Sequence, residues 1–179
     1  MPFEFIPTTL DGVLLVQPKT FPDNRGEFSE LFKQSEFTKN GITKPFVQTN
    51  FSISRRGVLR GLHFQADPMA QAKLVYVVSG SAFDVAVDVR KDSPFYGKWI
   101  SITLSSEKRN MIYIPEGFAH GFLALEDNTK LMYNCTAEYS PEHERGLRWD
   151  DPTLNIMWPI SNPIIADRDA QYPALSDIE

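Results

Sequence analysis

The chain has 179 residues, a net charge of −5 and a single cysteine. Its length suits one folded domain with its own hydrophobic core, and a lone thiol cannot form an intrachain disulfide. The acidic balance argues against a general nucleic-acid binder, and the sequence has no run of about 18 apolar residues to span a membrane. Residues 1–11 lack the basic and apolar regions of a signal peptide, so we expect a cytoplasmic protein.

Short runs of β-branched and aromatic residues follow one another along the chain, separated by scattered prolines and glycines. Runs with this spacing are typical of all-β sandwiches, jelly rolls and barrels. Two weaker helical patterns accompany them, at residues 29–38 and 167–175. The expected strands are residues 13–16, 47–53, 74–78, 82–89, 99–104, 111–114, 121–125 and 130–136.

The run at residues 82–89 alternates between two kinds of side chain. One face is apolar, which is typical of a strand with one packed side. The other face carries Asp84 and Asp88, so we expect it to be wet or functional. Farther along the chain, the apolar residues 154–163, which include Trp158, are expected to pack across the body of the fold.

The chain contains only three histidines, and none of them lies in a metal-binding motif such as His-x-His. A metal-dependent oxygenase of the cupin type is therefore not favoured. His63 follows Arg60 closely and is a candidate acid–base group, because imidazole exchanges protons near neutral pH; a hydrogen-bonded core histidine is the alternative. His120 precedes Gly121, which permits close approach of a ligand, with a strand corner as the alternative. His143 lies in a charged loop and is expected to be solvated.

Three cationic residues lie in motifs that make them candidates for binding an anionic group: Arg25, Arg60 and Lys73. A planar guanidinium suits diphosphate oxygens, and a lysine ammonium suits a developing enolate oxygen; a surface charge is the alternative for each. Cys135 lies within a predicted strand and is expected to be a buried thiol. The sequence has no glycine-rich dinucleotide loop, no P-loop and no nucleophile elbow, so the sites built on those motifs are not indicated.

Taken together, these motifs resemble the dTDP-4-dehydrorhamnose 3,5-epimerase family. The resemblance runs from about residue 15 to about residue 175. It rests on several blocks that occur in the family's order, and such a series is far more specific than any one block. The blocks are residues 21–28, 48–52, 59–65, 71–75, 83–90 and 114–122, and then 139–141 through 149–152.

The resemblance implies a cupin-type jelly roll with a few short helices, spanning residues 1–179 as one domain. It also implies a homodimer in which N-terminal segments are exchanged between the subunits. The implied substrate is a dTDP-linked 4-keto-6-deoxyhexose, inverted at C3 and C5 through an enolate. Neither a metal nor a redox cofactor is implied.

The resemblance also assigns roles to individual residues. His63 matches the family's general base, and Asp169 matches the carboxylate that orients it. Tyr133 matches the proton donor on the opposite sugar face, and Lys73 matches the cation near the C4 oxygen. Tyr139 matches an aromatic residue that stacks on thymine. The remaining substrate-contacting matches are Arg25, Glu30, Gln48, Asn50, Arg60, His120 and Glu144.

The chain departs from the family pattern at Met69, Tyr76 and Glu138, and at residues 166–169, where Ala-Asp-Arg-Asp replaces Ser-x-Lys-Asp. We expect these positions to lie at the periphery of the nucleotide and the sugar, so they bear on substrate identity more than on reaction type. Two alternatives remain open. The first is an epimerase that inverts only C3 or only C5, and the second is a sugar-nucleotide binding module without catalysis.

Overall fold

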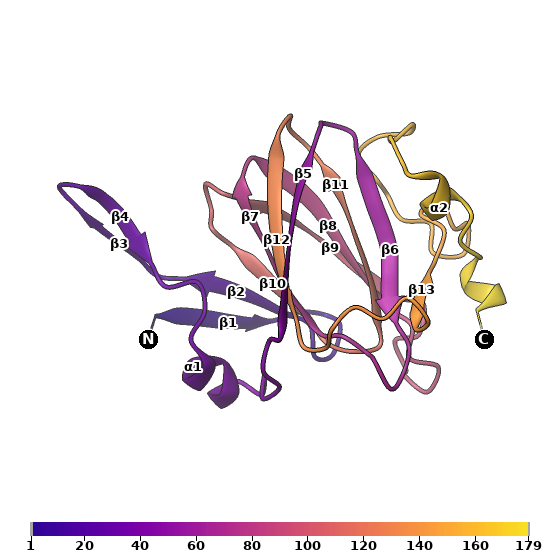
Figure 1. Ribbon diagram of the computed structural model, residues 1–179, viewed down its shortest axis with the longest axis horizontal. Helices are drawn as coiled ribbons and strands as arrows, with labels where there is room; N and C mark the ends of the chain where they lie inside the picture. The colour runs from indigo at the N-terminus through magenta and orange to yellow at the C-terminus, as the bar shows by residue number, and fades with distance from the viewer. Residues whose placement is uncertain (1, 179) are drawn as a thin grey trace.

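Two antiparallel β-sheets pack against each other and form the body of the molecule (Figure 1). The computed structural model describes residues 2–178. These two sheets are separate, and a third, two-stranded sheet forms a hairpin, so among the described strands the expected all-β sandwich is confirmed and a closed barrel is not formed. The first sheet has six strands, in the order β1 (Phe3–Pro7), β2 (Leu14–Pro18), β10 (Met111–Ile114), β7 (Lys73–Ser79), β12 (Thr129–Cys135) and β5 (Gln48–Ser54). The second has five, in the order β13 (Glu144–Gly146), β6 (Leu59–Gln65), β11 (Phe118–Ala124), β8 (Ser81–Asp88) and β9 (Trp99–Ser105).

The main core lies between the two sheets and is built from the inward side chains of alternating residues. Val75 and Leu131 of the first sheet belong to the same buried cluster as Ala86 and Phe118 of the second. Full burial of a side chain the size of leucine or phenylalanine contributes about 1.5–3 kcal/mol. This cluster holds the two sheets face to face, and so fixes the distance between side chains that project from opposite sheets.

Strand β8 is packed on both of its faces. Its alternating pattern predicted only one packed face. Val85 and Val87 on the apolar face pack against Leu154 of the C-terminal segment. The other face turns into the sandwich, where Asp84 and Asp88 are fully buried. Of the two expectations for this face, wet or functional, the first was wrong, because Asp88 is buried against Arg90 and Asp84 against the imidazole of His120.

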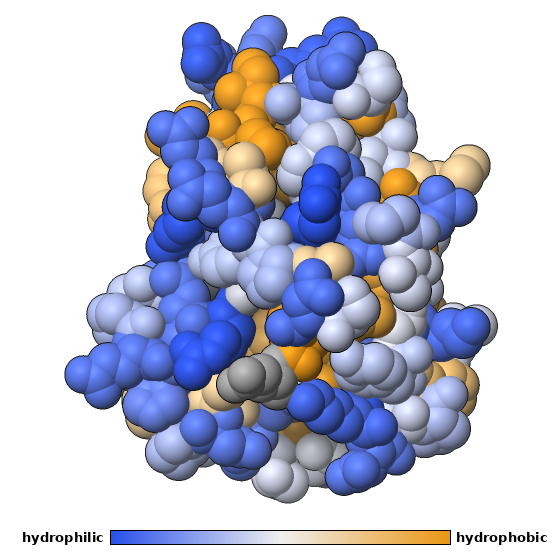
Figure 2. Space-filling model, turned by 90° about the vertical axis from the view of Figure 1, so that its right-hand side faces the viewer, coloured by the Kyte–Doolittle hydropathy of each residue, from blue (hydrophilic) through white to orange (hydrophobic). Residues whose placement is uncertain are grey.

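Residues 148–178 return across the outer face of the second sheet, as expected for residues 154–163. Trp158 packs against Phe83 with ring centroids 5.7 Å apart. The expected helix at residues 167–175 is divided into α2 (Asp167–Ala170) and the 3₁₀ helix η1 (Leu175–Asp177), because Pro173 cannot continue a helix. Figure 2 shows this side of the molecule, where hydrophilic residues predominate and apolar side chains emerge in patches.

The N-terminal part of the chain covers the outer face of the first sheet. The helix α1 (Gln34–Lys39) buries Phe37 against Phe3 and Met111. It is shorter than the expected 29–38 because residue 29 belongs to β4 (Gly26–Ser29), which pairs with β3 (Thr20–Asp23). This β3–β4 hairpin extends away from the body of the fold (Figure 1). None of the described helices is long and apolar enough to cross a membrane.

Strands β1, β3, β4, β6 and β13 are not among the strands that the sequence predicts. In β6, Arg60, Gly61 and His63 interrupt the run of β-branched and aromatic residues on which strand prediction relies. Backbone pairing with β11 on one side and β13 on the other nevertheless holds this segment in the second sheet. Gly61 adopts a φ of +129°, and a Cβ there would lie 2.5 Å from the Cα of Gly121, so only glycine allows β6 and β11 to approach so closely.

Candidate functional site

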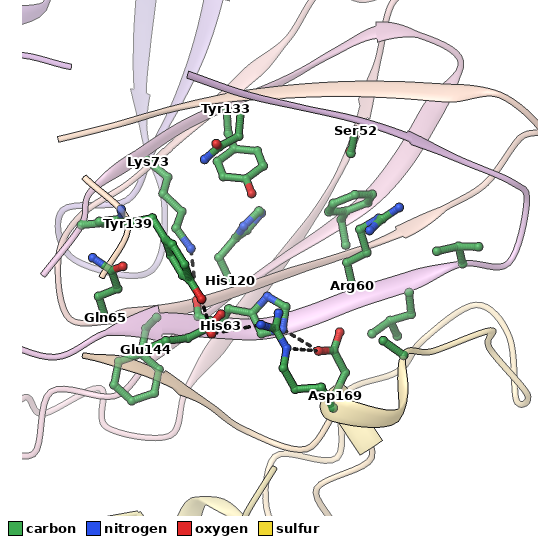
Figure 3. Close-up of a pocket in the computed structure, with 18 of the residues that line it drawn as sticks. Ser52, Arg60, His63, Gln65, Lys73, His120, Tyr133, Tyr139, Glu144 and Asp169 are labelled. Atoms are coloured by element: carbon green, nitrogen blue, oxygen red, sulfur yellow. Dashed lines mark hydrogen bonds and ion pairs between the residues drawn. The ribbon is translucent and has the colours of Figure 1, made fainter. Parts of the chain in front are cut away.

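A cavity of about 620 Å³ is lined by both sheets and by the C-terminal segment (Figure 3). All the candidate residues named from the sequence line this cavity, except Arg25 and Glu30. They come from positions far apart in the chain and meet because the two sheets face each other. The first sheet contributes Gln48, Asn50, Lys73 and Tyr133, the second contributes Arg60, His63, His120 and Glu144, and Tyr139 and Asp169 come from outside the strands.

His63 and Asp169 form a hydrogen-bonded pair at the cavity wall. Nε2 of His63 lies 2.8 Å from Oδ1 of Asp169, and Oδ2 of Asp169 accepts the backbone N–H of Gly61 at 3.1 Å. Burial raises the pKa of Asp169, but the hydrogen bonds from His63 and Gly61 outweigh it and hold the pKa below its ordinary value. An ionised carboxylate only accepts, so Nε2 of His63 carries the proton and Nδ1 is left as the basic nitrogen.

Lys73 is almost fully buried beside this pair, on β7. Its Nζ donates a hydrogen bond to the backbone carbonyl of His63 at 3.2 Å. Burial lowers the pKa of Lys73, against the opposing negative charges around it, among them Asp84. A cation in a site with little water interacts strongly with any negative charge that develops on a bound molecule.

Tyr133 projects into the cavity from the first sheet, whereas His63 belongs to the second. Figure 3 shows the Tyr133 hydroxyl turned toward the space between these two side chains. Burial raises the pKa of Tyr133, so the phenol keeps its proton and can donate it. The cavity therefore presents a base on one wall and an acid on the other.

His120 belongs to a second histidine–carboxylate pair. It lies opposite His63 on the neighbouring strand β11, and its Nε2 is 2.9 Å from Oδ2 of Asp84. Asp84 is fully buried on β8, and its Oδ1 has no hydrogen-bond partner among the described residues. Asp84 was not among the candidate site residues, although the alternation of β8 placed it on a face expected to be wet or functional.

The rim of the cavity is a hydrogen-bonded network around Glu144. The hydroxyl of Tyr139 donates to Oε2 of Glu144 at 2.9 Å, and Nη1 of Arg168 donates to the same oxygen at 3.0 Å. The Tyr139 side chain stays half exposed, so its ring face is accessible from the cavity. Gln48 accepts the backbone N–H of Tyr139 at 2.8 Å and donates to Asn50 at 2.9 Å. These contacts order one aromatic face and several polar groups at the mouth of the cavity.

The departures from the family pattern divide between the cavity wall and other parts of the molecule. Met69, Tyr76 and Glu138 do not line the cavity, and Tyr76 packs on the outer face of the first sheet. Arg168 does line it, and its position next to Asp169 in the sequence was the signal for it. His143 is half-buried rather than solvated, and its Nδ1 lies 2.7 Å from the hydroxyl of Ser140.

The two remaining candidates lie outside the cavity. Arg25 is exposed at the tip of the β3–β4 hairpin and forms an ion pair with Asp23 at 2.7 Å. Glu30 follows β4 directly. Within residues 2–178, no three His, Cys, Asp or Glu side chains gather in an arrangement that could hold a metal ion.

Comparisons with known proteins point to one family. The family model described as dTDP-4-dehydrorhamnose 3,5-epimerase matches residues 7–177. A relative of the same description from Methanothermobacter thermautotrophicus is 48% identical over 178 residues, which are 98% of this chain and 96% of the relative. A crystal structure of a dTDP-6-deoxy-D-glucose-3,5-epimerase from Legionella pneumophila, in complex with dTDP-4-keto-L-rhamnose, has a TM-score of 0.95 and 42% identity, covering 99% of this chain and 95% of that one.

A third protein has a similar fold, but its description names the inversion of a single carbon. It is a 3'-monoepimerase from Streptomyces bikiniensis in complex with dTDP-quinovose, with a TM-score of 0.89 and 35% identity over 95% of this chain and 87% of that one. The likeness to these solved structures confirms the expected cupin-type fold. The same fold thus occurs in proteins described by one inverted carbon and by two.

Proposed function

Because this chain belongs to the dTDP-4-dehydrorhamnose 3,5-epimerase family, we propose that it inverts C3 and C5 of a dTDP-linked 4-keto-6-deoxyhexose. The reaction converts dTDP-4-dehydro-6-deoxy-D-glucose to dTDP-4-dehydro-L-rhamnose. The observation that carries the proposal is that His63 and Tyr133 face one cavity from opposite sheets, with Lys73 buried beside them. Inversion beside a ketone requires a base on one face, an acid on the other and a stabiliser for the oxygen between them.

The proton transfers follow from these positions. Nδ1 of His63 removes the proton from the carbon beside the ketone, and the electron pair moves onto the C4 oxygen to give an enolate. The Tyr133 phenol then delivers a proton to the opposite face of the same carbon, and both side chains recover their starting states by exchange with solvent. Acid–base catalysis of this kind contributes about 10²–10⁴-fold to the rate. The same pair of groups serves both carbons, because each lies next to the ketone.

Lys73 acts on the oxygen rather than on the carbon. Its ammonium stabilises the negative charge that develops at the C4 oxygen during proton removal. One well-placed group of this kind contributes about 3–4 kcal/mol to transition-state stability. Asp169 keeps the proton of His63 on Nε2, which leaves Nδ1 free to act as the base at each turnover.

The rim of the cavity binds the nucleotide. Tyr139 stacks on the thymine, since its ring is half exposed and its hydroxyl is fixed by Glu144. Arg60 contacts the diphosphate, because a guanidinium pairs with two oxygens at once. Gln48, Asn50 and His120 contact the remaining polar groups of the substrate. A nucleotide-sugar substrate and a single cysteine both fit a reducing cytoplasm.

Arg25 and Glu30 would act at the cavity of a second copy of the chain. They lie outside the cavity of their own chain, on and next to a projecting hairpin. Phe21 and Phe28 on that hairpin are 43% and 64% exposed, and Phe51 on β5 is 54% exposed. A homodimer that exchanges the hairpin would cover these rings and deliver Arg25 to the partner's diphosphate. Sedimentation should give a dimer, and Arg25→Ala should weaken dTDP binding.

Solvent hydrogen exchange tests the proposed reaction. The substrate is incubated with the protein in heavy water, and the product is examined by NMR at C3 and C5. The expected product carries deuterium at both carbons, because each new C–H bond is formed from a solvent-equilibrated proton. Deuterium at one carbon alone would support the single-site alternative, and a substrate without deuterium would support the non-catalytic binding module.

A further inference from the structure

The two histidine–carboxylate pairs of the cavity differ sharply in their surroundings. His63 and His120 lie opposite each other on the adjacent strands β6 and β11. Asp169 is tied to His63 and to a backbone N–H, so both of its oxygens have partners. Asp84 is 0% exposed, and only one of its oxygens has a partner among the described residues. A buried carboxylate without full hydrogen bonding is costly, so its presence calls for a reason other than stability.

Packing does not supply that reason. Two other inward positions of β8, Ala82 and Ala86, join the apolar core between the sheets. Asp88, also fully buried and four residues along on the same face, is bound by Arg90 and by the hydroxyl of Ser93. Arg90 and Ser93 therefore satisfy Asp88, whereas among the described residues Asp84 has only the imidazole of His120 as a hydrogen-bond partner. Burial raises the pKa of Asp84, and His120 and Lys73 are the groups that oppose this and favour its ionised form.

We propose that Asp84 is a positioning residue of the epimerisation, which accepts the Nε2–H of His120 and supplies the buried negative charge that balances the Lys73 ammonium. The first action turns Nδ1 of His120 toward the cavity in one fixed tautomer. The second keeps Lys73 cationic in a place where burial disfavours its charge. The inference rests on the proposed function, since the Lys73 ammonium matters only if a negative charge develops beside it.

The charge of Asp84 should change the pKa of Lys73 in a direction that an experiment can detect. Burial lowers the pKa of Lys73, and the negative charge of Asp84 is one of the influences that oppose this. Removing that charge lowers the pKa of Lys73 further, so the ammonium loses its proton at a lower pH. If turnover requires the ammonium, the basic side of the pH profile then begins to fall at a lower pH. The other titratable groups around Lys73 are His63 on β6, His120 on β11, Tyr133 and Cys135 on β12, and Glu144 on β13.

Asp84→Asn tests the role, because the amide keeps the shape and the hydrogen-bond acceptor but removes the charge. The maximal rate should fall by about tenfold or more, as for other lost electrostatic stabilisers. The basic limb of the rate profile should move to lower pH, because the pKa of Lys73 falls further when the opposing charge is removed. The dissociation constant for dTDP should stay within about twofold of the unchanged protein, since the nucleotide contacts lie at the rim. Asp84→Leu, which keeps the branching at Cγ but removes both the charge and the hydrogen-bond acceptor, should lose more activity.

Asp88→Asn is the matched control. It removes a fully buried carboxylate from the same face of the same strand, away from the cavity. It should lower the melting temperature without moving the pH profile. Asp84 would be merely structural if Asp84→Asn kept the basic limb unchanged, or if it lost dTDP binding and thermal stability in step with turnover. If the unchanged protein fails to exchange hydrogen at either carbon, the proposed function itself is wrong and the positioning role falls with it.

Discussion

His63 on β6 and Asp169 on α2 are 106 positions apart in the sequence, and their side chains meet at 2.8 Å. The pair exists only when the C-terminal segment has returned across the second sheet, because Asp169 belongs to that segment and His63 to the sheet. The proposed acid–base chemistry therefore depends on packing contacts well outside the cavity.

Asp169→Asn should lower the maximal rate by about 10²–10⁴-fold, because an amide can donate to Nε2 and so favour the wrong tautomer of His63. The dTDP affinity should hold, since the rim contacts are untouched. Steady-state kinetics together with calorimetric titration of dTDP would measure both. A variant with near-normal turnover would mean that the carboxylate does not set the tautomer.

Tyr133→Phe should separate proton removal from inversion. The variant keeps His63 and Lys73, so the substrate should still exchange hydrogen with heavy water, but on the original face of the sugar. Product formation should fall by about 10²–10⁴-fold, the usual contribution of a general acid. Mass spectrometry and NMR of the recovered substrate would detect deuterium without inversion.

Tyr76→Phe is the control for that experiment. Tyr76 loses the same hydroxyl but packs on the outer face of the first sheet, away from the cavity. It should leave turnover and exchange unchanged. Equal losses in the two variants would remove the case for Tyr133 as the acid.

Tyr139→Ala should weaken dTDP binding by about 1–3 kcal/mol, the range measured for stacking of a base on an aromatic ring. Tyr139→Phe should keep most of this affinity, because it retains the ring and loses only the hydroxyl that donates to Glu144. Titration of dTDP into the two variants distinguishes stacking from the hydrogen bond. Equal losses would assign the affinity to the hydroxyl instead.

Asp88 should make stability depend on pH in one direction. Burial raises its pKa, but the hydrogen bonds from Arg90 and Ser93 outweigh this and hold the pKa below its ordinary value. A carboxyl group whose pKa is lower in the folded than in the unfolded state stabilises the fold at pH values above its unfolded-state pKa of about 3.9. This stabilisation is lost as the pH falls through the folded-state pKa. Asp88→Asn should therefore cost about 1–3 kcal/mol at neutral pH. The cost should shrink below about pH 4, as urea unfolding at several pH values would show. A cost that stays constant with pH would mean that the charge of Asp88 contributes nothing.

The all-β class could be predicted because alternating apolar residues report directly on strands. Strand β6 was missed because Arg60, Gly61 and His63 serve the site and break that pattern. Pattern alone also could not tell that the Asp84 face of β8 turns inward, since alternation separates two faces without saying what covers each one. The surrounding sheet decides that, and it is formed by residues distant in the chain.

The candidate site was predicted chiefly through family resemblance, which named ten of the residues that line the cavity. Local sequence around His63 left a core histidine as an equal alternative, because the partner Asp169 lies far along the chain. Asp84 and Arg168 were noted in the sequence but were not candidate site residues, since their roles depend on which side chains they meet in the folded protein. Arg25 and Glu30 remain predictions that depend on a second copy of the chain.

His63 is proposed as the base for both carbons, and exchange in heavy water tests this role most directly. The unchanged protein should place deuterium at C3 and at C5 of the product. His63→Asn should place it at neither carbon while binding dTDP with an affinity within about twofold of the unchanged protein, because the rim is intact. Exchange at either carbon in the His63→Asn protein, at a rate close to that of the unchanged protein, would contradict the account.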